Sequence, residues 1–200
     1  MVLYWHGKNS VSIESGGFTL LVDPLDLEKE LKSAKPADVV LLSRPSGLKL
    51  PAKTVSFVIA NPGEYDVKGF FILGFGGLNP SAGLGSGDGV AYTIESEGMR
   101  IVHLSLDKEL TAAQLESLSD VDVLVIDVGV DDDINETAAK IVGQIEPRIV
   151  IPVGYDAVKK PMIFLKEMGA SDVEGQNKLS LKKKDLPQEE TKVVLLNAAK

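Results

Sequence analysis

The order of strand-like and helix-like segments is the feature that most limits the fold of this chain. Short apolar runs succeed one another through the first half, separated by Gly, Asn and Ser turns, and helices alternate with strands only in the second half. An open doubly wound sheet would alternate from its start, so we exclude it. The order predicts an α/β fold in which two mixed β-sheets pack face to face with helices outside, a four-layer αββα sandwich.

Strands are predicted wherever β-branched and aromatic residues gather. They cover residues 2–6, 11–14, 18–22, 39–42, 55–59, 69–75, 90–95, 100–104, 121–128, 148–153 and 192–197. The runs 121–128 and 148–153 are almost continuously apolar, which is typical of strands buried on both faces. Residues 96–98 fit a hairpin turn.

Helices are predicted over residues 26–33, 110–118, 134–145 and 162–168. Asp26 suits the N-cap of the first helix. Thr111 and Gln114 have the spacing of a capping box, and Asp133 with Glu136 gives a second such signal. Three aspartates at 131–133 therefore indicate a helix N-terminus rather than a hard-cation site, and the glycine-rich run 83–89 indicates a loop, since a strand rather than a helix follows it.

Composition describes an ordinary globular chain, and for 200 residues we expect one domain, residues 1–200. The sequence has no cysteine, which excludes disulfides and thiolate chemistry and fits a cytoplasmic protein. A net charge of −8 disfavours nucleic acid as a partner, since phosphate binding needs a basic face. We expect no membrane association either, because no run approaches the ~20 apolar residues of a membrane span and the first residues lack a signal-peptide pattern.

Four segments carry motifs that together point to one family. Residues 5–10 read Trp-His-Gly-Lys-Asn-Ser, residues 22–24 read Val-Asp-Pro, residues 61–69 read Asn-Pro-Gly-Glu-Tyr-Asp-Val-Lys-Gly, and residues 152–155 read Pro-Val-Gly-Tyr. They resemble the metallo-β-lactamase-fold hydrolases, in particular the compact branch that includes the ascorbate-phosphate lactonase-like hydrolases. The resemblance covers about residues 3–197. It implies a metal-dependent hydrolase fold built around zinc or another dinuclear metal centre.

The resemblance also implies where the metal ligands would stand, and this chain carries other residues there. Arg44 and Ser46 replace the first two histidines of the ligand motif, Leu48 replaces its aspartate, and Lys49 replaces its third histidine. A protonated Arg or Lys offers no lone pair to a metal at pH 7, and leucine has no donor atom.

Two further ligand positions are replaced. Leu106 stands in place of the aspartate that would bridge two metals, and Gly154 stands in place of the last histidine. The whole chain has only two histidines, His6 and His103, so a shifted alignment cannot supply the missing ligands. We therefore expect no metal, no other cofactor and no catalytic residue.

The residues around the former metal centre form the predicted vestigial cleft. They are His6, Asp23, Arg44, Ser46, Leu48, Lys49, His103, Leu106, Gly154 and Tyr155. Either histidine also fits a purely structural role, and Asp23 fits a turn as well as a carboxylate left from the metal site. We expect the cleft to be packed shut, with Leu48 and Leu106 as apolar fill and with Arg44 and Lys49 paired with remaining carboxylates such as Asp23. The alternative is an open anion pocket lined by Arg44 and Lys49.

The predicted function follows from these losses. The chain is interpreted as a pseudoenzyme that binds a small anionic ligand or a protein partner, or has a structural role, and a homo-oligomer is compatible with this. The alternative hypothesis is a hydrolase that acts on an anionic substrate through a relocated site, with Arg44, Lys49, His103 and Tyr155 around it.

Overall fold

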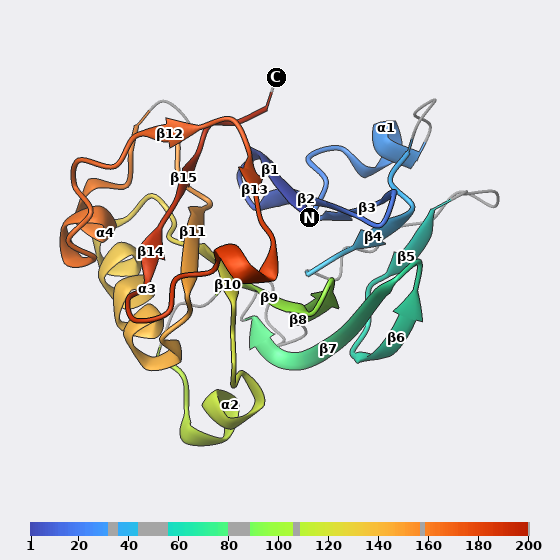
Figure 1. The fold of residues 1–200 in the computed structure, drawn as a ribbon, viewed down its shortest axis with the longest axis horizontal. Coiled ribbons are helices and arrows are strands. Elements are labelled where there is room, and N and C mark those ends of the chain that lie inside the picture. The colour runs from blue at the N-terminus through green and yellow to red at the C-terminus, as the bar shows by residue number, and fades with distance from the viewer. Residues whose placement is uncertain (32–35, 44–55, 80–88, 106–108, 157–158, 200) are drawn as a thin grey trace.

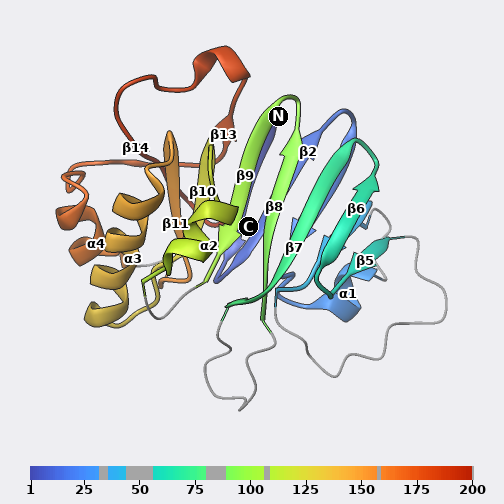
Figure 2. The ribbon, with the colours of Figure 1, turned by 90° about the horizontal axis from the view of Figure 1, so that it is seen from below.

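The computed structural model describes residues 1–31, 36–43, 56–79, 89–105, 109–156 and 159–199. These residues form two mixed β-sheets that face each other and carry helices on their outer sides (Figures 1 and 2). The predicted α/β sandwich is therefore confirmed.

The first sheet has six strands in the order β13-β1-β2-β3-β4-β5. Their bounds are β1 Val2–Gly7, β2 Ser10–Ser15, β3 Phe18–Val22, β4 Val39–Leu41, β5 Phe57–Ile59 and β13 Leu179–Ser180. The first three strands form the predicted antiparallel meander, and β3, β4 and β5 run parallel. The turn between β1 and β2 has positive φ at Gly7 and Lys8, which permits its tight reversal.

The second sheet has seven strands in the order β14-β11-β10-β9-β8-β7-β6. Their bounds are β6 Gly63–Val67, β7 Phe70–Asn79, β8 Gly89–Ser96, β9 Met99–Leu104, β10 Val123–Asp127, β11 Ile149–Val153 and β14 Lys192–Val193. Strands β9, β10, β11 and β14 run parallel, whereas β6 to β9 are antiparallel. Glu97 and Gly98 both have positive φ, as a two-residue hairpin turn requires, so the predicted hairpin is confirmed.

Helices α2 Ala112–Ser117, α3 Asp132–Ile145 and α4 Met162–Glu167 lie outside the seven-stranded sheet, and α1 Leu27–Leu31 lies beside the other sheet (Figures 1 and 2). The Asp26 carboxylate accepts the Lys29 amide hydrogen at 2.9 Å, which caps α1 as predicted. Thr111 and Gln114 form the predicted capping box of α2.

The prediction of Asp133 as the cap of α3 is wrong. Asp131 is the N-cap residue, although its side chain makes no capping bond. The buried Asn135 explains the earlier start, because its backbone N–H donates to the Asp131 carbonyl and its side-chain amide bonds the carbonyls of both Asp131 and Val128. Asn135 Oδ1 also accepts the Phe164 amide hydrogen at 3.3 Å and so ties α3 to α4.

The core lies between the sheets and extends beneath α3 and α4. Trp5, Phe70 and Tyr92 are the largest buried side chains from the facing strands. Every residue of β11 is buried, and β10 is buried up to Ile126, as the continuous apolar runs predicted. Each such Val or Ile contributes about 1.5–3 kcal/mol on burial, so these strands supply much of the fold's stability.

The C-terminal segment joins both sheets and adds structure that the sequence did not predict. The predicted strand at 192–197 is divided: β14 pairs with β11, and β15 Leu195–Leu196 pairs with β12 Gly175–Gln176. A 3₁₀ turn, η1 Lys183–Asp185, precedes β14 and β15. Through β13 and β14 this segment connects an edge of one sheet to an edge of the other.

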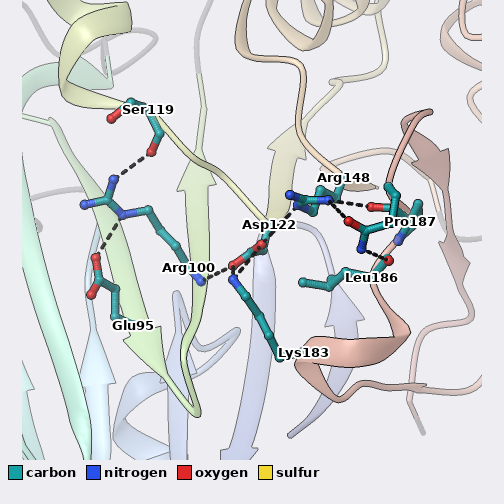
Figure 3. Close-up of polar contacts among 9 residues, drawn as sticks. Glu95, Arg100, Ser119, Asp122, Arg148, Lys183, Leu186 and Pro187 are labelled. Carbon is teal, nitrogen blue, oxygen red and sulfur yellow. Dashed lines mark hydrogen bonds and ion pairs between the residues drawn. The ribbon is translucent and has the colours of Figure 1, made fainter.

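The buried carboxylate of Asp122 fastens this segment at the amino end of β10 (Figure 3). It accepts the Arg100 amide hydrogen at 2.9 Å, and it pairs with Lys183 Nζ at 2.9 Å and with Arg148 Nε at 3.5 Å. Arg148 also donates to the Pro187 carbonyl at 2.8 Å. One carboxylate therefore links two strands and the chain that crosses them.

Candidate functional site

A cavity of about 770 Å³ lies at the carboxyl ends of the parallel strands, where the connecting loops converge. We call it the cleft. Its described lining comes from the β1–β2 turn and from the segments that follow β3, β4, β10 and β11. The lining residues are Lys8, Asn9, Asp23, Pro24, Leu25, Leu42, Asp127, Gly129, Val130, Asp131, Ile134, Gly154, Tyr155 and Asp156. Pockets at this edge of parallel strands are a common location for ligand sites.

Asp127, the last residue of β10, is held by hydrogen bonds on both carboxylate oxygens. Oδ2 accepts from Asn9 Nδ2 at 2.8 Å and from Ser105 Oγ at 2.9 Å. Oδ1 accepts from the Gly129 amide at 2.9 Å. The carboxylate is thus fixed in one orientation at the floor of the cleft by three different segments.

Gly154 lies directly against that carboxylate. A Cβ built on residue 154 would overlap Oδ1 of Asp127 and would lie 2.6 Å from its Cγ and 2.8 Å from Asn9 Oδ1. The backbone φ of +81° at Gly154 is also one that side-chain-bearing residues rarely adopt. The place that a side chain at 154 would need is therefore occupied by Asp127.

Asp23 directly follows β3 with a positive φ of 45° and turns its side chain toward the end of β4. Its carboxylate accepts from the Ser43 backbone N–H at 2.7 Å and from the Ser43 hydroxyl. Burial, with smaller contributions from Asp23 and Tyr65, raises the pKa of the nearby Tyr92, whose hydroxyl donates to the Leu42 carbonyl at 2.9 Å. Asp23 lines the cleft, but both its oxygens already hold the β3–β4 junction.

His103 is buried in β9 and is absent from the cleft's described lining. Its Nε2 lies 3.1 Å from the Asn9 carbonyl; since a carbonyl can only accept, Nε2 carries the proton. Nδ1 has no hydrogen-bond partner among the described residues. The β1–β2 turn, through the Asn9 carbonyl, therefore fixes the tautomer of His103. This contact fits a structural role for His103.

Tyr155 forms one wall of the cleft and stacks on Trp5, with ring centroids 4.7 Å apart. Its hydroxyl donates to the Leu196 carbonyl at 3.5 Å, and burial raises the pKa of Tyr155 to about 12. The Lys8 carbonyl accepts from both Trp5 Nε1 at 2.7 Å and the Gly154 amide at 2.9 Å. The β1–β2 turn thus holds the β11 end in place.

His6 lies away from the cleft. It alternates with the inward-facing Trp5 along β1 and so projects from the opposite face of the sheet. There its Nε2 lies 2.8 Å from Ser12 Oγ, and burial lowers the pKa of His6 while the charge of Glu30 opposes that shift. It lines another cavity, of about 480 Å³ beside α1, which shares Pro24 and Leu25 with the cleft.

The remaining predicted cleft residues, Arg44, Ser46, Leu48, Lys49 and Leu106, lie outside the described residues, as does the run 83–88. The apolar fill and the ion pairs with carboxylates such as Asp23 that we expected depend on them. The described residues leave a cavity here rather than a packed interior. Among the described lining residues the charged side chains are mostly acidic: Asp23, Asp127, Asp131 and Asp156 carry carboxylates, and Lys8 carries an ammonium group.

Sequence reasoning missed Asp127, Asn9 and Ser105. Asp127 had a signal, since a carboxylate directly after a buried parallel strand is placed at the edge where binding sites form. Asn9 and Ser105 had none, because their importance depends on contacts to Asp127 from segments distant in the sequence.

The described residues do not fit the dinuclear metal centre that the fold implies. Among the described residues no three His, Cys, Asp or Glu side chains are grouped so that they could hold a metal ion. The Asp127 and Asp23 carboxylates are bonded to protein donors, and Gly154, where the resemblance places the last ligand, has no room for a side chain.

Comparisons with known proteins agree with this fold. A proposed zinc-dependent hydrolase of the metallo-β-lactamase superfamily, from Thermotoga maritima, is 25% identical to this chain. The two structures have a TM-score of 0.69 over 98% of this chain and 97% of that one. A proposed metal-dependent hydrolase from Parabacteroides distasonis has 16% identity and a TM-score of 0.63, over 97% and 92%. The metallo-β-lactamase fold protein YhfI from Bacillus subtilis has 13% identity and a TM-score of 0.65, over 100% and 98%.

No curated protein matches the sequence. None of the helices in the described parts of the chain has the length and apolar character needed to cross a bilayer. The sequence profile of the family described as "Beta-lactamase superfamily domain" matches residues 2–154. That match spans most of the chain, and together with the two-sheet architecture it shows that this chain belongs to the β-lactamase superfamily and has the metallo-β-lactamase fold.

Proposed function

We propose that this chain is a metallo-β-lactamase-fold pseudoenzyme: a single-domain cytoplasmic protein that has lost the metal-binding motif and serves as a non-catalytic binding or structural protein. The family's chemistry rests on metal ions, which generate hydroxide near pH 7 and polarise the scissile bond. A scaffold without their ligands retains the fold and the cleft but not that catalyst.

The observation that carries the proposal is the contact between Asp127 and Gly154. A ligand lost by a single substitution leaves an empty space that a reverse substitution could fill. Here the carboxylate of Asp127 occupies the space, and Asn9, Ser105 and Gly129 hold it there. Asp127 thus fills the space at the position where the resemblance places the last histidine, which supports a lasting loss of the metal site.

A second candidate is a hydrolase with a relocated site for an anionic substrate. It is favoured by His103 Nδ1, which is buried without a partner among the described residues. The described geometry gives it less support: His103 does not line the cleft, the Tyr155 hydroxyl donates to a backbone carbonyl, and the acidic lining opposes an anion.

Elemental analysis of protein purified without a His-tag, from medium supplemented with zinc, manganese and iron, tests the first proposal. We expect no stoichiometric metal after dialysis, and background turnover of phosphodiester, lactone and β-lactam substrates with or without added metal. Tightly bound metal together with chelator-sensitive turnover would refute the pseudoenzyme. Turnover that survives a chelator but is lost in His103→Ala would support the relocated site instead.

A further inference from the structure

A second cavity adjoins the cleft. It has a volume of about 690 Å³ and lies between the β10–α3 loop and the start of α4. Gly129, Val130, Tyr155 and Asp156 line both cavities. We call the two cavities together the groove, because their shared wall makes them neighbouring parts of one surface. Either cavity alone has the size of a small-ligand pocket, whereas the pair suits a longer ligand.

Exposed apolar side chains are concentrated along this groove. Leu25, Val130 and Met162 are 58%, 71% and 50% exposed, and each lines one or both cavities. Val130 lies at the shared wall, so a molecule that crosses it can reach both cavities. Large apolar side chains that gather around a depression, with charged residues at its rim, are typical of an interaction site.

The charge of the groove indicates what kind of partner fits. Asp131 and Asp132 are exposed at its rim, and Asp131 makes no capping bond to α3. Three lysines also line the groove: Lys8, Lys159 and Lys160. The ammonium group of Lys160 already donates to the Val173 carbonyl at 2.7 Å. The described lining therefore carries more negative than positive charge, and the chain as a whole has a net charge of −8. Such a surface favours a basic partner and disfavours an acidic one.

We propose that the groove docks an extended segment of a partner protein in which large apolar side chains alternate with Lys or Arg. Apolar side chains of the segment would cover Leu25, Val130 and Met162, while its basic side chains would face the aspartates of the rim. The inference rests on the proposed non-catalytic binding function and names the chemistry of the partner.

The protein contains its own reporter for this site. Trp5 is the only tryptophan in the chain, and it stacks on Tyr155, which lines both cavities. A ligand that contacts Tyr155 changes the surroundings of that ring pair. Intrinsic fluorescence therefore reports occupancy of the groove without a label.

The test uses three short synthetic peptides in which Leu and Phe alternate with Lys, with Glu or with Ser. Binding is followed by Trp5 fluorescence and by amide chemical-shift mapping of the full chain. Two variants change the groove, Val130→Lys and Asp131→Lys. Two matched controls change the same kinds of residue elsewhere: Phe71→Ser, exposed on β7, and Asp133→Lys, which lines neither cavity.

We expect the Lys peptide to bind best, its affinity to fall with added salt, and each groove variant to weaken it about tenfold or more, which corresponds to about 1.4 kcal/mol. The controls should change affinity less than about twofold. Equal or tighter binding of the Glu peptide, equal binding to wild type and both groove variants, or no binding of any peptide would each overturn the proposal. Metal content and turnover, measured separately, show whether the pseudoenzyme proposal itself has failed.

Discussion

The carboxylate of Asp127 and the α-carbon of Gly154 are packed so closely that no side chain fits between them. Two residues at the ends of neighbouring parallel strands, β10 and β11, thus share the volume of one side chain. The packing predicts a specific pattern of coupling between them.

Gly154→Ala should destabilise the fold by about 2–4 kcal/mol, because overpacking adds to the strain of a positive φ. In an Asp127→Ala background the same change should cost only about 1–2 kcal/mol, since the strain and the 2.8 Å approach to Asn9 Oδ1 remain but the overlap with the carboxylate is gone. Urea denaturation of the four proteins of this double-mutant cycle measures the difference. Gly143→Ala is the control: it lies in α3 with open space around it, so it should be neutral or stabilise by up to about 1 kcal/mol. If the free-energy costs of the changes at 127 and 154 simply added in the double mutant, the close packing of the two residues would be contradicted.

Asp122→Ala should cost about 1–3 kcal/mol, because the partly buried Arg100 amide loses its acceptor. Lys183→Met should cost less than about 1 kcal/mol, since that side chain is 58% exposed and water can replace it as a partner of the carboxylate. Chemical denaturation gives both values, and hydrogen exchange at Lys192 and Val194 reports whether the C-terminal segment loosens. A larger loss of stability in Lys183→Met than in Asp122→Ala would contradict the view that the Asp122 carboxylate, rather than its ion pair with Lys183, holds this region together.

Apolar burial rather than metal should hold the fold together. Ile126→Ala and Ile151→Ala, in the almost fully buried strands β10 and β11, should each cost about 2–5 kcal/mol. A chelator should leave the melting temperature unchanged. A fall of many degrees on chelation, measured by calorimetry, would show that a bound metal contributes to stability.

Tyr155 should make the fold less stable at alkaline pH. Its pKa is raised by burial to about 12 in the folded state, whereas an unfolded tyrosine titrates near 10. The folded state therefore holds the proton more tightly, and its stabilising effect is complete below about pH 10 and is lost as pH rises through about 12. Tyr155→Phe should flatten the decline in unfolding free energy over this range, by about 1.4 kcal/mol per pH unit. An unchanged slope in the variant would contradict the burial assigned to the hydroxyl.

The sequence predicted those parts of the fold whose signal is local. The runs 121–128 and 148–153 are apolar at nearly every position, and they became β10 and β11, buried as expected. Thr111 and Gln114 needed only each other to form their capping box. By contrast, β12, β13 and β14 have two residues each, too few to show a period, and their pairing depends on distant strands.

The cleft was predictable in its location but not in its contents. Asp23, Gly154 and Tyr155 line it, because their motifs mark the ends of strands. His6 could not be placed from the sequence, since a shift of one residue along β1 decides which face of the sheet it occupies. Asp133 failed as a cap because the buried Asn135 forms bonds that start the helix at Asp131, and no local rule describes that competition.

The crossing of the C-terminal segment between the sheets has a consequence for biosynthesis. Strand β1 is bordered on one side by β13, and β11 is bordered on one side by β14. A nascent chain that ends before residue 179 therefore presents two unpaired strand edges, one on each sheet, and the β11 edge stays unpaired until residues 192–193 are made. Other chains can add at such edges. Vectorial folding on the ribosome cannot close either edge early, so the final closure of both sheets falls at the end of translation of this segment, when a chaperone that shields strand edges would matter most.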